Sequence, residues 1–144
     1  MGADIRPVGE RSEGGEPVAD LVVRGAELVA ARVAPEEVPG LIDEVPALCV
    51  AAAFAAGRTE VRGAGELRVK ESDRIASVAA ALQAIGGAIE EREDGWSVNG
   101  TGRLRGGNVE ARGDHRIAMA FLVMGLRGGA TAFGGTPLQK AYTV

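Results

Sequence analysis

An internal repeat restricts the fold of this chain more than any other feature of its sequence. Several short stretches of the first half recur in the second half in the same order, displaced by 70 to 84 residues. The matched stretches are 1–5 with 85–89, 43–54 with 114–126, 57–59 with 129–131, and 65–70 with 135–140. A shared order of individually weak matches indicates a duplicated supersecondary unit. We therefore expect a first unit at 1–84 and a second at 85–144, the second ending before its last helix, as in a piece of a longer protein.

The predicted elements of both units alternate between strands and helices. Between 71 and 84, apolar residues recur with the 3.6-residue period of an amphipathic helix. Two more helices are expected at 44–56 and 115–126, each preceded by an aspartate, Asp43 or Asp114, that can cap its first turn. Strands are expected at 3–8, 20–24, 59–62, 88–92, 96–99, 108–111 and 130–133, and a polar loop at 9–16. This alternation predicts an α+β fold of layered α/β type, with helices packed on a sheet.

Composition excludes several classes of protein. The 144 residues include 16 Lys or Arg and 20 Asp or Glu, and the net charge of −4 argues against a nucleic-acid or anionic-membrane partner. The single cysteine, Cys49, excludes a disulfide framework within the chain. No apolar run reaches the roughly 20 residues of a membrane span, and the first residues do not resemble a signal peptide. We expect a cytoplasmic protein.

Five consecutive polar residues, 70–74, mark the start of the helix expected at 71–84. One interpretation is a solvated first turn with a serine or aspartate cap. The other is an anion site, because Lys70 and Arg74 are four residues apart and would share one helix face. Free backbone N–H groups at a helix start also favour negative charge. Glu71 would be held ionised by these cations.

A second polar group surrounds the only histidine, His115, which lies between Asp114 and Arg116. A single histidine is more often structural than catalytic. With no second His and no Cys nearby, a transition-metal site is not expected. Near the end of the chain, Lys140 corresponds in the repeat to Lys70.

The repeat places these charged residues at corresponding helix starts of two similar units. If the helices run parallel, their N-termini open on one edge. Arg74, Arg116 and Lys140 would then form one anion pocket, with Asp43 and Glu71 as proton-transfer candidates beside it. Such a clamp suits phosphate or carboxylate binding, and group transfer needs acids and bases next to it.

Three segments resemble the motifs of one enzyme family. They are Glu66–Ile75 (ELRVKESDRI), Gly113–Ala120 (GDHRIAMA) and Ile42–Pro46 (IDEVP), the last coming before an alanine-rich helix. The sequence resembles the 5-enolpyruvylshikimate-3-phosphate (EPSP) synthase family, also called 3-phosphoshikimate 1-carboxyvinyltransferase. The resemblance covers nearly the whole chain, which corresponds to most of the family's C-terminal domain.

The resemblance implies both a fold and a reaction. The fold consists of repeated βαβαββ units whose parallel helices face a cleft between two domains. The family transfers the enolpyruvyl group of phosphoenolpyruvate to the 5-hydroxyl of shikimate 3-phosphate, releases phosphate, and needs no metal or organic cofactor. The reaction belongs to the shikimate pathway to chorismate and aromatic amino acids. Glyphosate mimics phosphoenolpyruvate, which makes it a candidate ligand of the same site.

The resemblance also assigns residue roles. The carried-over residues are Asp43 and Glu71 as catalytic groups, and Lys70, Arg74, His115, Arg116 and Lys140 as substrate-binding groups. Asp43 is matched to the carboxylate that contacts the shikimate hydroxyls and serves as base, and Glu71 to the group that gives and takes a proton at C3. Lys70 is matched to the shikimate-phosphate side and His115 to the lining of the phosphoenolpyruvate site. Most contacts to shikimate 3-phosphate come from the N-terminal domain, so this chain alone is expected to be nearly inactive.

Two alternatives stay open at this point. The first is enolpyruvyl transfer to a UDP-amino sugar, a class that shares the repeat but uses a reactive cysteine. Cys49 lies inside an apolar, alanine-rich helix, where packing is its expected role. The second is a non-catalytic structural fragment that self-associates through an exposed apolar face.

Overall fold

The structure, a computed structural model, describes residues 1–128 and 131–134 and has the expected α+β architecture. Its strands are β1 (Asp4–Glu13), β2 (Glu16–Arg24), β3 (Arg32–Val33), β4 (Gly57–Val61), β5 (Ala88–Arg92), β6 (Gly95–Gly100), β7 (Gly107–Glu110) and β8 (Thr131–Gly134). Its helices are α1 (Val45–Phe54), α2 (Arg74–Ala84) and α3 (His115–Gly128), with 3-10 helices η1 (Val38–Gly40) and η2 (Gly65–Val69). None of the described helices combines the length and the apolar character needed to cross a bilayer.

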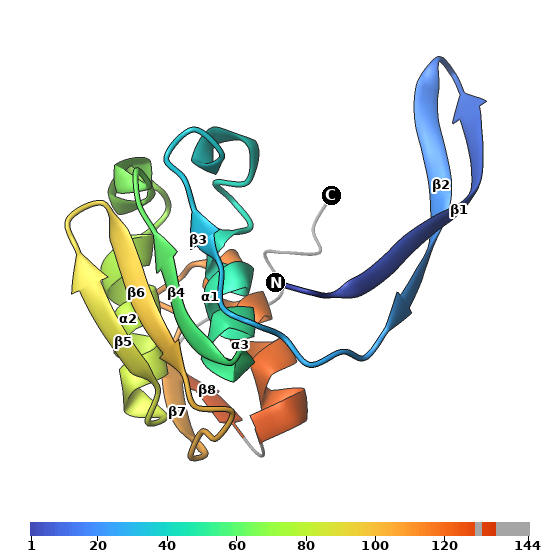
Figure 1. Ribbon diagram of the computed structural model, residues 1–144. Helices are drawn as coiled ribbons and strands as arrows, with labels where there is room; N and C mark the ends of the chain where they lie inside the picture. The colour runs from blue at the N-terminus through green and yellow to red at the C-terminus, as the bar shows by residue number, and fades with distance from the viewer. Residues whose placement is uncertain (129–130, 135–144) are drawn as a thin grey trace.

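A four-stranded sheet, in the order β3-β4-β6-β5, forms the centre of the fold. β3 and β4 run parallel, and β6 runs antiparallel to both of its neighbours. α1 and α2 pack against this sheet, and α3 packs against α1 (Figure 1). β7 and β8 form a separate parallel pair. The result is a layer of helices on a layer of strands, as the alternation of elements predicts.

Strands from both expected repeat units share the central sheet. β3 and β4 lie before residue 84, whereas β5 and β6 lie after it. The division into 1–84 and 85–144 therefore does not coincide with a boundary between sheets. In chain order, β3-α1-β4-α2-β5-β6 is one βαβαββ string, and β7-α3-β8 repeats its first half. We propose that the repeat unit runs from β3 to β6.

The hydrophobic core between sheet and helices centres on Trp96 of β6, whose exposed fraction is 1%. The indole N–H of Trp96 donates to the carbonyl of Ile75 at 2.9 Å and joins β6 to the first turn of α2. Ile75, Val78 and Leu82 are buried on one face of α2, with the helical period seen in the sequence. The periodicity thus correctly identifies the buried face of this helix.

Two glycines bound the central strand β6. A Cβ atom at Gly95 would overlap the carbonyl oxygen of Val61, and a Cβ atom at Gly100 would overlap the carbonyl oxygen of Ala55. Neighbouring backbone therefore approaches β6 at both ends more closely than any other residue type permits.

β1 and β2 form an antiparallel hairpin that extends away from the rest of the molecule (Figure 1). The polar loop expected at 9–16 is wrong. Strand pairing continues to Glu13 and Glu16, and only Gly14 and Gly15 form the turn, both with positive φ. Two glycines suit a two-residue hairpin turn, because both central positions need positive φ.

Candidate active site

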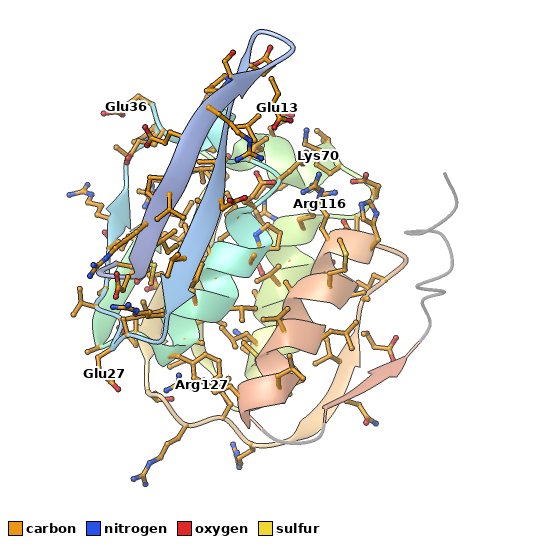
Figure 2. The ribbon with its side chains drawn as sticks, turned by 90° about the vertical axis from the view of Figure 1, so that its right-hand side faces the viewer. Glu13, Glu27, Glu36, Lys70, Arg116 and Arg127 are labelled. Atoms are coloured by element: carbon orange, nitrogen blue, oxygen red, sulfur yellow. The ribbon has the colours of Figure 1, made fainter. Side chains whose placement is uncertain are left out.

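Charged side chains from three separate stretches meet where the helices begin. Arg74 is the first residue of α2, Asp114 directly precedes α3, and Asp43 lies two residues before α1. Ion pairs connect Arg74 to both aspartates. Figure 2 shows Arg116 at this end of α3 and Arg127 at the other end. The three helix starts therefore lie together, as the repeat predicts.

The most deeply buried pair at this edge is Arg74 with Asp114. Their side chains are 1% and 0% exposed, and Nε of Arg74 donates to Oδ2 of Asp114 at 2.8 Å. The hydroxyl of Ser72 donates to the same oxygen at 3.2 Å. Burial opposes the charge of Arg74, but hydrogen bonds and charges of the surrounding carboxylates more than offset it, so the pKa of Arg74 is raised. Arg74 thus remains a cation inside the protein.

Asp114 also caps α3, as the sequence predicts. Its Oδ1 accepts from the backbone N–H groups of Arg116 at 3.0 Å and Ile117 at 3.4 Å. One carboxylate therefore satisfies the start of α3 with one oxygen and holds Arg74 with the other. Its position couples the beginning of α3 to the beginning of α2.

Asp43 does not cap α1, which corrects the sequence-based expectation. The residue before α1 is Glu44, and it makes no side-chain capping bond. The carboxylate of Asp43 instead joins two arginines, with Arg74 Nη1 at 2.9 Å and Arg116 Nη2 at 3.2 Å. The hydrogen bond from Arg74 and the charges of Arg116 and Lys70 hold the pKa of Asp43 below its ordinary value. Asp43 is therefore an ionised carboxylate between two cations.

The segment that carries Lys70 and Glu71 lies before α2 rather than inside it. α2 begins at Arg74, and Asp73 caps it, accepting from the backbone N–H of Ala76 at 2.9 Å. The expected shared helix face of Lys70 and Arg74 is therefore wrong. Glu71 pairs with Nη2 of Arg74, which brings it to the same cluster by a different route.

Three further residues are expected in the site from the sequence: Lys70, His115 and Lys140. Lys70 is paired with Glu66, at the same end of the molecule as Arg116 (Figure 2). His115, the first residue of α3, is partly exposed. Lys140 lies outside the described residues.

The described cluster is rich in negative charge. Arg74 and Arg116 contact four carboxylates, those of Asp43, Glu71, Asp114 and Glu44. All three guanidinium nitrogens of Arg74 donate to a carboxylate. Arg116, with 32% of its side chain exposed, is the more accessible cation. An anion that binds to the guanidinium nitrogens already paired would have to replace one of these carboxylates.

A hollow of about 220 Å³ opens beside the cluster between α1 and α3. Its charged end is formed by Asp43, Glu44 and Arg116. The remaining lining residues are Pro46, Ala47, Val50, Met119, Ala120 and Val123. The accessible arginine therefore lies at the edge of a mainly apolar hollow.

Within residues 1–128 and 131–134, no three His, Cys, Asp or Glu side chains are grouped as a metal site. Cys49 is buried in α1, and burial raises the pKa of its thiol to about 12. A thiol that stays protonated at neutral pH lacks the character of a reactive cysteine.

Sequence reasoning missed the second role of Asp114. Its position before a helix indicated a cap, but nothing in the local pattern indicated that it would neutralise Arg74, 40 residues away in the sequence. The repeat was the available indication, because it placed both residues at helix starts.

Comparisons with known proteins assign this chain to a family. The family model of EPSP synthase (3-phosphoshikimate 1-carboxyvinyltransferase) matches residues 1–136. The chain belongs to the EPSP synthase family. Its fold also matches an EPSP synthase structure from Acinetobacter baumannii with a TM-score of 0.88 and 43% identity, covering 94% of this chain and 32% of that one.

Curated relatives within the EPSP synthase family carry the name 3-phosphoshikimate 1-carboxyvinyltransferase. One, from Paramagnetospirillum magneticum, is 57% identical over 88% of this chain and 29% of its own length. Another, from Cereibacter sphaeroides, is 53% identical over 99% of this chain and 33% of its own length. The chain thus spans about a third of the length of these relatives.

Proposed function

We propose that this chain supplies the phosphoenolpyruvate-binding side of an enzyme that transfers the enolpyruvyl group to shikimate 3-phosphate. The observation that carries the proposal is the position of Asp43. Its carboxylate lies between guanidinium groups from the starts of α2 and α3, at 2.9 and 3.2 Å. Family membership supports the same assignment.

Arg116 is the first contact we assign to phosphoenolpyruvate. Its side chain is partly exposed, and its partners Asp43 and Glu44 are themselves 40% and 67% exposed, so these ion pairs can be exchanged for a substrate carboxylate at small cost. Arg74 would be the second contact to phosphoenolpyruvate, once the ion pair of Glu71 or Asp43 with one of its nitrogens is broken. Bidentate binding to guanidinium groups suits the carboxylate and phosphate of this substrate.

The transfer then proceeds by addition and elimination. Glu71 enters the first step protonated, once a substrate oxygen has replaced it on Arg74, and gives its proton to C3 while the 5-hydroxyl oxygen bonds to C2 and the hydroxyl proton goes to Asp43. In the second step the bond between C2 and the phosphate oxygen breaks, Glu71 takes a proton back from C3, and Asp43 gives its proton to the phosphate that leaves. Asp43 and Glu71 both contact Arg74, which supports their action on one bound substrate. We assign His115, Lys70 and Lys140 to binding in the same site.

Titration of the chain with phosphoenolpyruvate, followed by NMR, tests the proposal. We expect shifts of the Arg74 and Arg116 side-chain resonances and of the backbone amides at the starts of α2 and α3. Arg116→Ala should weaken binding by about tenfold or more, as expected for a lost charge-assisted contact. Arg127→Ala, at the other end of α3, is the matched control and should change affinity less than about twofold.

A titration without shifts at these helix starts would overturn the proposal, as would equal effects of the two arginine variants. Glyphosate should compete with phosphoenolpyruvate if both occupy this site. Cys49→Ala, which removes the buried thiol without adding bulk to the core, should leave binding unchanged, whereas a requirement for the thiol would favour transfer to a UDP-amino sugar.

Catalysis by this chain alone should be very weak. Both substrates must be held together, and a 1,000-fold loss corresponds to about 4 kcal/mol of transition-state stabilisation. If this chain alone turned over substrate as fast as a full-length relative does, the proposal that it supplies only one side of the active site would be wrong.

Self-association is a second proposal, favoured by exposed apolar side chains. Leu21 and Val23 on β2 are each 65% exposed, and Leu126 on α3 is 89% exposed. Apolar surface of this kind favours contact between copies. Sedimentation velocity at several concentrations should show a rising average mass, and a constant monomer mass would exclude the proposal.

A further inference from the structure

We propose that Arg68 is a positioning residue for the candidate active site, because it fastens the segment that carries Glu71 to the turn between β5 and β6. The inference rests on the proposed function of that site. Arg68 lies in η2 and is not one of the residues assigned to substrate.

The guanidinium of Arg68 binds the β5–β6 hairpin through several groups. Its Nε donates to the carbonyl of Glu93 at 2.8 Å, and Nη2 donates to the carbonyl of Arg92 at 2.7 Å. Nη2 also reaches the carboxylate of Glu91 at 3.1 Å. The carbonyl oxygens of two successive residues, Arg92 and Glu93, thus accept from one guanidinium group. Together they define the position of this group more closely than a single exposed ion pair does.

The third nitrogen of Arg68 connects the hairpin to α2. Nη1 donates to Oδ2 of Asp73 at 2.8 Å, while Oδ1 of Asp73 accepts from the N–H of Ala76 and caps α2. Asp73 directly precedes Arg74, and Glu71 lies two residues earlier. Arg68 therefore holds the residue that determines where α2 begins and how Arg74 enters the cluster.

The other end of the same segment is attached to the same turn. Asp94 accepts from the N–H of Gly63 through its side chain at 2.9 Å and from the N–H of Ala64 through its carbonyl at 2.8 Å. These two attachments and Arg68 tie residues 63–73 to the β5–β6 turn. The turn thereby sets the position of Glu71 and Arg74 from outside the site.

This arrangement predicts an effect on a residue that Arg68 does not contact. Asp43 has ion pairs with Arg74 and Arg116, and its reduced pKa depends first on the hydrogen bond from Arg74. If Arg68 positions Arg74 through Asp73, loosening Arg68 should weaken that hydrogen bond. The pKa of Asp43 should then rise toward its ordinary value.

Three variants separate positioning from charge. Arg68→Lys keeps the positive charge but cannot reach four acceptors at once. Arg68→Ala removes both. Arg58→Ala is the matched control, because Arg58 also forms ion pairs with Glu60 and Glu90 but lies at the start of β4, away from η2.

Two readouts are used on the whole chain. We expect the pKa of Asp43, measured by carboxyl ¹³C NMR, to rise in both Arg68 variants and to stay unchanged in Arg58→Ala. Affinity for phosphoenolpyruvate should fall by about tenfold in Arg68→Ala and about threefold in Arg68→Lys, against less than twofold in the control. Dispersed amide spectra identify variants that keep the fold.

The outcomes distinguish this inference from the proposed function. If the parent chain does not bind phosphoenolpyruvate, the proposed function fails, while the pKa of Asp43 still tests positioning. An unchanged pKa of Asp43 in folded Arg68→Lys would overturn the inference even when the parent binds. A rise in Arg68→Ala alone would also overturn it, because charge rather than geometry would then be responsible. If Arg68→Ala loses the fold, Arg68→Lys decides.

Discussion

The β1–β2 hairpin and the body of helices and central sheet are stabilised in opposite ways. Ion pairs of the hairpin stay within it and are at least partly exposed: Arg6 pairs with Asp4 along β1, and Arg11 pairs with Asp20 across the two strands. Ion pairs of the body connect Arg74 to carboxylates 31 and 40 residues away, and one of them is fully buried. The hairpin depends on its own turn and strand pairing, whereas the body depends on segments brought together by the whole fold.

The two regions also differ in how far their apolar side chains are exposed to solvent. On the hairpin, Ile5 and Leu21 are more than half exposed, while Leu67 and Ile75 in the body are fully buried. Burial of such side chains is the main source of stability. We therefore expect the two regions to respond differently to the same kind of substitution.

The largest expected effect follows from removing a buried carboxylate. Asp114→Ala should lower the free energy of unfolding by about 4 kcal/mol, because it leaves Arg74 with a buried, unpaired donor and α3 without its cap. Asp4→Ala in the hairpin removes an exposed pair with Arg6 and should cost less than about 0.5 kcal/mol. Urea denaturation followed by circular dichroism measures both values. Similar losses for the two variants would contradict the comparison.

A smaller difference between the hairpin and the body should appear in the rates of amide hydrogen exchange. The hairpin can open without separating the core, so its amides should exchange at least about 100-fold faster than those of α2, relative to intrinsic rates. Leu21 and Val78 are convenient reporters. Equal protection in both regions would indicate that the hairpin and the body open as one unit.

The smallest expected effect concerns acid. The pKa of Asp43 is lowered in the folded state, so its ion pairs contribute stability above the ordinary value of about 3.9. This contribution is lost as pH falls through the lower folded-state pKa. Asp43→Asn should therefore make the stability less dependent on pH between about pH 5 and 2 than it is in the parent chain. Equally steep losses in both proteins would show that other carboxylates dominate.

The sequence predicts the helices well because their information is local. The apolar period of α2 and the aspartate before α3 are each contained within a few residues. The hairpin is less predictable, since residues 9–13 lack regular apolar alternation and look like a charged loop. Pairing with β2 imposes the strand there, and the Gly14–Gly15 turn makes that pairing possible.

Sequence reasoning predicts which charged residues meet at the helix starts, but not which partners they bind there. Repeat positions indicate that Arg74 and Arg116 approach each other, and both do contact Asp43. Local patterns do not show that Arg74 is buried, since burial depends on how closely α2 and α3 pack. The prediction that Asp43 caps α1 is wrong for the same reason. Asp43 instead forms ion pairs with Arg74 and Arg116, which lie far from it in the sequence.

The glycines that bound β6 have a consequence for how the sheet assembles. If β6 moved by one residue in either direction, a side chain would replace the hydrogen at Gly95 or Gly100 and overlap a neighbouring carbonyl group. Such a shift would also turn Trp96 to the opposite face and separate it from Ile75. A one-residue shift of β6 is therefore opposed by overlap with neighbouring backbone as well as by the loss of core packing around Trp96. Both effects favour the observed pairing of β6 with β4 and β5.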